Sequence, residues 1–125
     1  MRRYRADPLY HATPSRNVSS IRAHGIRLSS GARGQAFETP RIYLTDDTNM
    51  TYAFAAQLFA EEPDIGEVSV LEVDPRQVAG LHDDPDWCDD THLDYVPVIG
   101  YTEEAIPASA VGRVVEVYTR DDFDD

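Results

Sequence analysis

Two short apolar segments of the chain each carry one side chain that could contact a ligand. Residues 9–12 contain His11, and residues 42–44 contain Tyr43. An imidazole nitrogen can donate or accept a hydrogen bond with a hydroxyl group, and an aromatic face suits a flat, positively charged ring. Both residues can equally be ordinary parts of a sheet, since tyrosine favours strands. The residues alone therefore leave two interpretations, a binding site and plain strand architecture.

The segment between these two strands predicts a short helix and a loop. Thr13 followed by Pro14 predicts a helix start, because Thr can cap a helix and Pro suits its first position. Gly25 is predicted to end this helix in the left-handed conformation. Residues 29–40 contain two glycines and Arg33, and they predict a surface loop of the kind that carries function on a rigid scaffold.

The rest of the pattern predicts one α+β domain with a mixed sheet packed by two main helices. A second helix is expected over residues 49–60, and residues 67–73 (EVSVLEV) predict a central strand, because they are apolar on both faces. We divide the chain into an extension (1–8), the domain (9–119) and a solvated acidic tail (120–125).

Composition indicates an acidic protein of a single domain. The chain has 125 residues and a net charge of −12, and all 11 of its basic residues are arginine. Such a charge opposes general binding to DNA or RNA, and it suits a high-salt cytoplasm. One cysteine excludes an internal disulfide. We expect a cytoplasmic location and no membrane association, because no signal peptide or membrane-spanning stretch is visible.

An acidic segment over residues 82–94 allows a metal-binding interpretation. It contains His82, Cys88 and His92 among many aspartates. Its histidines and cysteine do not form paired motif spacing, and it lacks the glycine and terminal glutamate of an EF-hand loop. A solvated charged loop without metal is the favoured prediction.

The order of these motifs resembles the ADP-ribosyltransferase superfamily. Residues 9–13 (LYHAT), the helix ending in residues 24–26 (HGI), the loop, and residues 42–45 (IYLT) follow one another as in that superfamily. They are most similar to the small branch with the tRNA 2′-phosphotransferases and DarT-like proteins. Residues 103–111 (EEAIPASAV) are similar to a late strand and turn of the same branch.

The resemblance implies an ADP-ribosyltransferase-like fold with a split sheet. It also implies that the protein binds NAD in a cleft of this sheet and cleaves the nicotinamide–ribose bond of NAD. His11 would bond the adenosine-side ribose, backbone near Ala12 and Thr13 would meet the nicotinamide amide, and Tyr43 would stack on the nicotinamide ring. Arg16 has a counterpart among the arginines of the 2′-phosphotransferases. Arg33 in the loop would pair with the pyrophosphate. The acceptor is open: a protein, a nucleic-acid end or a small molecule.

The sequence leaves three alternatives for the third catalytic residue. Many relatives use a late glutamate to stabilise the positive charge that develops on the ribose. Glu103 is the first choice, and Glu104 and Asp94 are alternatives. Two other functions remain: an RNA 2′-phosphotransferase-like activity, and a non-catalytic binding protein that keeps the fold.

Overall fold

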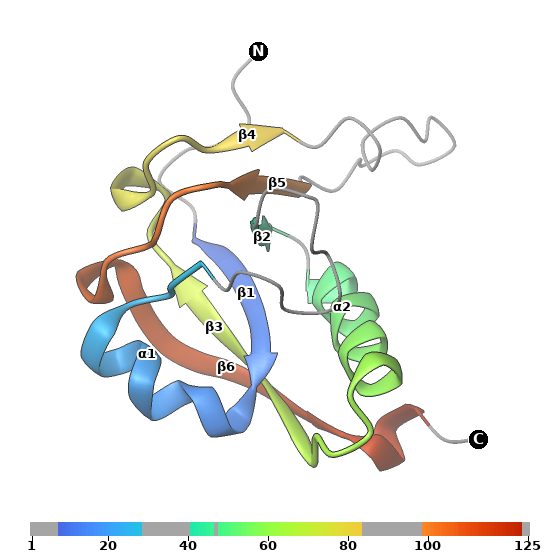
Figure 1. Cartoon of the computed structure of the whole chain (residues 1–125). Helices are drawn as coiled ribbons and strands as arrows, with labels where there is room; N and C mark the ends of the chain where they lie inside the picture. The colour runs from blue at the N-terminus through green and yellow to red at the C-terminus, as the bar shows by residue number, and fades with distance from the viewer. Residues whose placement is uncertain (1–7, 29–40, 47, 84–98, 124–125) are drawn as a thin grey trace, which may run out of the picture.

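The computed structural model describes residues 8–28, 41–46, 48–83 and 99–123 (Figure 1). Its two α-helices are α1 (Val18–His24) and α2 (Thr48–Glu61). The strands are β1 (Leu9–Pro14), β2 (Ile42–Thr45), β3 (Glu67–Val73), β4 (His82–Asp83), β5 (Ile99–Thr102) and β6 (Val111–Thr119). Short 3-10 helices are η1 (Ser15–Asn17), η3 (Pro75–Gln77), η4 (Ala108–Ala110) and η5 (Arg120–Phe123). The prediction of an α+β domain with two main helices is confirmed.

The strands form one six-stranded sheet in the order β4-β5-β2-β1-β3-β6. Every pairing among the described strands is antiparallel, so the prediction of a mixed sheet is wrong. A strand–helix–strand order suggests parallel crossovers. Here β2 and β3 both run antiparallel to β1, which lies between them, so the crossover through α2 joins two parallel strands that are not neighbours in the sheet.

Among the described strands, the ladder between β1 and β2 has the fewest paired residues. All six residues of β1 pair with β3, and four residue pairs join β2 to β5. A single pair, Tyr10 with Thr45, joins β1 to β2. The sheet therefore consists of two halves, β4-β5-β2 and β1-β3-β6, which one residue pair joins.

The core has two clusters, one on each face of the sheet. Leu9 of β1 packs with Ile21 of α1 on one face, and Ala12 of β1 packs with Ala55 of α2 on the other. β3 contributes to both faces, with Leu71 on the α1 side and Val70 on the α2 side. The prediction that β3 is a central, doubly buried strand is confirmed, because it lies between β1 and β6.

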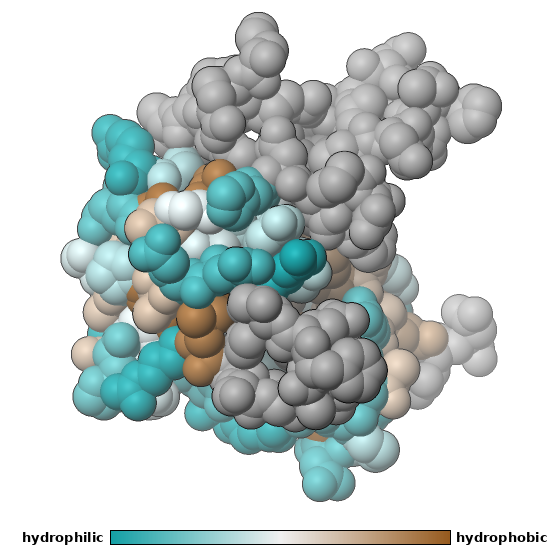
Figure 2. All heavy atoms as spheres, turned by 45° about the horizontal axis from the view of Figure 1, so that its top comes forward, coloured by the Kyte–Doolittle hydropathy of each residue, from teal (hydrophilic) through white to brown (hydrophobic). Residues whose placement is uncertain are grey.

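The surface of the described chain is mostly polar. Figure 2 shows a largely hydrophilic face with small, separate hydrophobic areas. Two large hydrophobic side chains of the described residues are exposed, Tyr52 and Val117. The longer helix, α2, has 14 residues, and neither described α-helix combines the length and apolar character that crossing a membrane requires.

The predicted start of the first helix is wrong. Thr13 is buried and pairs with Ser69, and Pro14 pairs with Val68, so the ladder continues where a cap was expected. α1 begins only at Val18, after η1. The long β1–β3 ladder, with its buried side chains, outweighs the local cap preference of Thr and Pro.

The predicted end of α1 at Gly25 is confirmed. Gly25 has a φ of 83°, and its N–H donates to the Ile21 carbonyl at 2.7 Å. The next residue, Ile26, exchanges two backbone hydrogen bonds with Ile106, at 2.8 and 2.9 Å. A Cβ at Gly25 would collide with the Ile106 carbonyl oxygen. Gly25 therefore ends the helix and also allows the chain to reach Ile106.

The predicted acidic tail begins with η5 (Arg120–Phe123), in which Asp121 and Asp122 are exposed. The Arg120 guanidinium donates to the backbone carbonyls of Phe59, Glu62 and Ile65 at 3.2, 2.9 and 3.1 Å. A cation at a helix C-terminus interacts favourably with the helix dipole and with carbonyls that have no partner in the helix. Phe123 packs beside Phe59, with ring centroids 5.4 Å apart. This segment therefore holds the end of α2.

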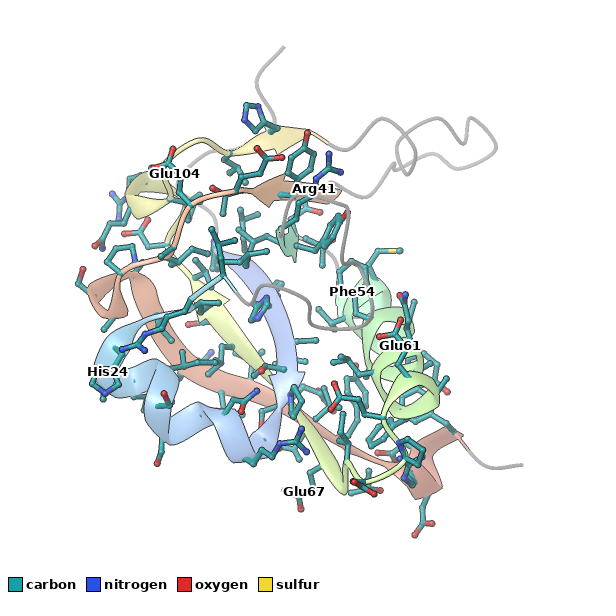
Figure 3. The ribbon with its side chains drawn as sticks, in the orientation of Figure 1. His24, Arg41, Phe54, Glu61, Glu67 and Glu104 are labelled. Carbon is teal, nitrogen blue, oxygen red and sulfur yellow. The ribbon has the colours of Figure 1, made fainter. Side chains whose placement is uncertain are left out.

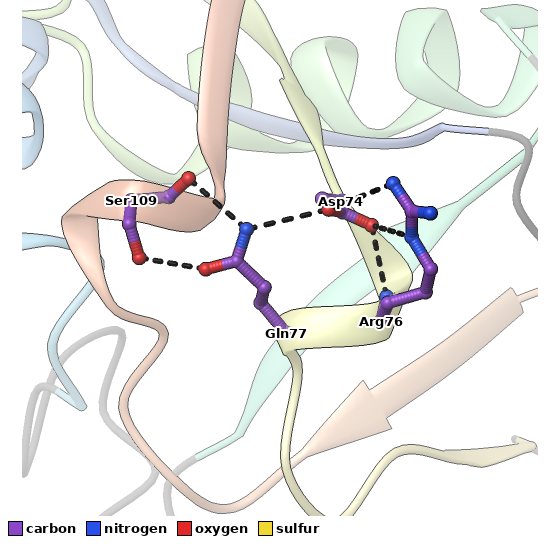
Figure 4. A network of polar contacts seen from close by, with 4 residues as sticks. All are labelled: Asp74, Arg76, Gln77 and Ser109. Atoms are coloured by element: carbon purple, nitrogen blue, oxygen red, sulfur yellow. Dashed lines mark hydrogen bonds and ion pairs between the residues drawn. The ribbon is translucent and has the colours of Figure 1, made fainter.

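A polar network joins η3 to η4 (Figure 4). Asp74 caps η3 by accepting from the Arg76 backbone N–H at 3.0 Å, and its carboxylate also accepts from the Arg76 side chain. Gln77 accepts a hydrogen bond from the Ser109 hydroxyl at 2.6 Å. The Arg76 side chain, the Arg76 backbone N–H and Gln77, in that order of effect, lower the pKa of Asp74.

We expect Gly25→Ala to lower the free energy of unfolding by about 2 kcal/mol or more, because alanine resists a positive φ and its Cβ would collide with Ile106. Urea denaturation monitored by circular dichroism measures the change. Gly66→Ala is the matched control, since a Cβ there meets nothing within 4 Å. Equal stability of the two variants would contradict this role of Gly25.

We expect Arg120→Met to destabilise the fold by about 2–4 kcal/mol, since three backbone carbonyls lose a charged donor. Arg120→Lys should restore only part of this loss, because an ammonium cannot present the same fork of donors. Arg22→Met, which removes one exposed bond to the Gly112 carbonyl, is the control and should cost under about 1 kcal/mol. A change for Arg120→Met as small as that of the control would rule out the capping role.

We expect Asp74→Asn to destabilise the protein at neutral pH and to have less effect in acid. Because the folded pKa of Asp74 is lowered, its stabilisation is present above the ordinary aspartate pKa and is lost as the pH falls through the folded value. Urea midpoints of wild type and variant, measured from about pH 7 to pH 3, should therefore converge at low pH. A difference that does not change with pH would show that the Asp74 charge is not the cause.

Candidate functional site

His11 lies at the thin junction of the sheet. Its Nδ1 is 3.1 Å from the backbone carbonyl oxygen of Tyr43. A carbonyl oxygen can only accept, so Nδ1 carries the proton, and in the neutral ring Nε2 is then an acceptor nitrogen. Continued in the same register, the β1–β2 ladder would place Tyr43 opposite Ala12. The imidazole therefore bonds a carbonyl at the point where the ladder stops.

The side chains of His11 and Tyr43 lie on opposite faces of the sheet. His11 pairs with Leu71, whose side chain belongs to the α1-side core. Tyr43 alternates with Ile42 and Leu44, which belong to the same α1-side core, so its ring lies on the other face. The structure thus brings the two predicted residues together through the backbone of Tyr43, while their side chains diverge.

Tyr43 belongs to a polar and aromatic cluster on β2, β4 and β5. Tyr43 is opposite Tyr101 in the ladder, with ring centroids 6.1 Å apart, and Tyr101 is opposite His82, with centroids 5.4 Å apart. Arg41 and Glu103 extend the same face, two residues from Tyr43 and Tyr101 respectively. We call these five residues the Tyr43 cluster: Arg41, Tyr43, His82, Tyr101 and Glu103.

The Arg41 guanidinium is the centre of this cluster. Its Cζ lies 4.0 Å from the centroid of the Tyr101 ring, and its Nε lies 3.5 Å from a Glu103 carboxylate oxygen. A side-chain hydrogen bond to Tyr43 is the main cause that raises the pKa of Arg41, while burial acts in the opposite direction. The side chains of Arg41 and Glu103 are 38% and 42% exposed, so solvent reaches both. Arg41 therefore remains a cation that contacts three members of the cluster.

The candidates for the third catalytic residue have different surroundings. Glu103 shares a face with Tyr43 and pairs with Arg41. Glu104 is exposed, and its carboxylate lies beside Gly80, because a Cβ built on that glycine would be 2.9 Å from a Glu104 oxygen. Asp94 lies outside the described residues. Of the two described candidates, Glu103 is the one near Tyr43.

The other predicted donor-binding residues are more scattered. Ala12 and Thr13 are buried, at 8% and 5% exposure. Arg16 forms an ion pair with Glu62 at 2.9 Å, at the far end of α2. Figure 3 shows Arg41 at the β4–β5 end of the molecule and Glu67, which lines a pocket together with Arg16, at the opposite end. Arg33 lies outside the described residues.

The pocket beside Arg16 has acidic walls. Asp64 and Glu67 line it together with Arg16, and Glu62 pairs with that arginine from beside it. No group of three or more potential metal ligands occurs among the described residues. Most of the acidic segment 82–94 lies outside that part of the chain, so its predicted lack of metal stays a prediction.

Sequence reasoning missed Arg41 and Tyr101. Both are visible as a spacing, since Arg41 precedes Tyr43 by two residues and Tyr101 precedes Glu103 by two. Residues two apart on a strand share a face, and opposite residues of paired strands interact. What the sequence does not contain is the β2–β5 register that places Tyr43 against Tyr101.

No protein-family model matches the chain, and no curated protein matches it significantly. The resemblance of residues 9–13 and 42–45 to ADP-ribosyltransferases therefore remains a prediction. Function has to be inferred from the residues of this chain.

Proposed function

We propose that this protein binds NAD at the junction between β1 and β2 and transfers its ADP-ribosyl group to an acceptor. The observation that carries the proposal is the hydrogen bond from His11 Nδ1 to the Tyr43 carbonyl. It joins the two motif residues at the one place where a single residue pair connects the halves of the sheet.

The side chains available at the junction have the chemistry that such a donor needs. An imidazole nitrogen can bond a ribose hydroxyl, and the ring of Tyr43 can stack on the nicotinamide. In the reaction, the bond between nicotinamide N1 and ribose C1′ breaks, nicotinamide leaves with the electron pair, and the acceptor oxygen or nitrogen bonds C1′ and loses its proton.

A second candidate is a non-catalytic binding protein that keeps the fold. The observation in its favour is the Arg41–Glu103 ion pair, because the first-choice catalytic carboxylate already has a cationic partner. An RNA 2′-phosphotransferase-like activity has less support. Arg16 is paired with Glu62, and Arg113, a less close counterpart of that branch's arginines, is paired with Glu72, both away from the Tyr43 cluster.

We expect the wild-type chain to bind NAD in titration calorimetry and to release nicotinamide. Tyr43→Ala should weaken binding at least fivefold, which corresponds to about 1 kcal/mol for a lost stacking contact. His11→Gln, which keeps a hydrogen-bond donor, should fold and bind NAD more weakly, and His11→Ala should lose both binding and some stability. The control is His24→Ala, since that histidine is exposed at the end of α1 (Figure 3).

The outcomes separate the two candidates. NAD binding without nicotinamide release, for every acceptor class offered, would favour the non-catalytic protein. No NAD binding by the folded wild type, or unchanged binding in both the His11 and Tyr43 variants, would refute the proposal.

A further inference from the structure

We infer that Glu103 acts through Arg41: it neutralises the guanidinium beside Tyr43 so that a positively charged ring can bind there. This role rests on the proposed function, and it makes Glu103 a positioning and charge-compensating residue. It differs from the expectation that a late carboxylate contacts the reacting ribose.

The contacts of Arg41 carry the inference. Its guanidinium lies over Tyr101, with Cζ 4.0 Å from the ring centroid, and Tyr101 is opposite Tyr43 in the β2–β5 ladder, with ring centroids 6.1 Å apart. Its Nε lies 3.5 Å from Glu103, whose carboxylate shares the face of both tyrosines. A cation thus lies beside the ring that would receive the nicotinamide, and its countercharge comes from the residue that follows β5.

Electrostatics explain why the countercharge matters. The nicotinamide ring of NAD carries a positive charge, so an unpaired guanidinium beside Tyr43 would repel it. At a separation of about 5 Å in a solvent-exposed site, the repulsion weakens binding by a factor of about two to ten. The Glu103 carboxylate removes most of this repulsion, and the pair as a whole is nearly neutral toward the ligand.

The cluster also explains why the cation is retained. Arg41 stacks on Tyr101, which lies beside Tyr43, so it supports the orientation of the two rings across β2 and β5. Replacing it by a neutral residue would remove the repulsion together with the support of the rings. An arginine with a dedicated carboxylate provides the support without the net charge.

A cycle of variants at positions 41 and 103 tests the inference. The dissociation constants of NAD and NADH are measured by calorimetry for wild type, Glu103→Gln, Arg41→Gln, the double variant with both changes, and Arg41→Lys combined with Glu103→Gln. NADH is the ligand control, because its dihydronicotinamide ring has no positive charge. The initial rate of nicotinamide release gives kcat and KM for each variant, and thermal unfolding verifies that each is folded.

We expect Glu103→Gln to weaken NAD binding by about two- to tenfold and NADH binding by less than twofold. Adding Arg41→Gln removes ring support for both ligands alike, so it should return the ratio of the NAD and NADH dissociation constants to within about twofold of wild type, whereas adding Arg41→Lys, which keeps the charge, should not. The NAD defect should shrink as salt is raised, since exposed charges are screened. The value of kcat should change little across the series.

The ion pair of Arg113 with Glu72 provides a matched control. It has the same Nε–Oε2 distance of 3.5 Å, and it joins β6 to β3 in the other half of the sheet. Glu72→Gln and Arg113→Gln should leave both dissociation constants unchanged.

Two results would overturn the inference while leaving the proposed function intact. One is a large fall in kcat for Glu103→Gln that Arg41→Gln does not restore, which would mean that Glu103 contacts the reacting atoms. The other is that Glu103→Gln weakens NAD and NADH binding equally. Absence of NAD binding in the wild type would instead refute the proposed function, and this inference with it.

Discussion

The hydrogen bond between the His11 imidazole and the Tyr43 carbonyl is the constraint on which the candidate site depends. One residue pair and this bond connect β1 to β2, whereas six pairs hold β1 to β3. Each half of the sheet has its own ladder, and the α1-side core packs across both, since Ile42 and Leu44 join Leu9 and Leu71 in one cluster. At His11 itself the connection is made by a side chain, which gives this histidine a structural task in addition to any contact with a ligand.

The described arginines with a polar contact have one of two kinds of partner, a carboxylate or a backbone carbonyl. The chain has 11 basic and 23 acidic residues. Among the described arginines, Arg16, Arg41, Arg76 and Arg113 pair with carboxylates, and Arg22 and Arg120 donate to backbone carbonyls. The first group forms ion pairs in which the arginine charge is neutralised. The second group supplies donors to backbone carbonyls.

Local signals predicted much of the fold, and long-range pairing decided the rest. The strands around His11 and Tyr43, the stop at Gly25 and the central position of β3 follow from periodicity and turn chemistry. The Thr13 cap failed because a buried ladder with Ser69 competes with it. Likewise, the opposite faces of His11 and Tyr43 and the contact of Arg41 with Tyr101 depend on strand register, which no local pattern encodes.

The position of Arg120 has a kinetic consequence. Its guanidinium bonds carbonyls that precede it by 55 to 61 residues, so α2 acquires this cap only when the chain after β6 has come back beside it. Contacts between distant residues slow folding, because a long loop must close before they form. During synthesis, the end of α2 waits uncapped until the ribosome has released residue 120, and the nascent helix is open to fraying throughout that interval.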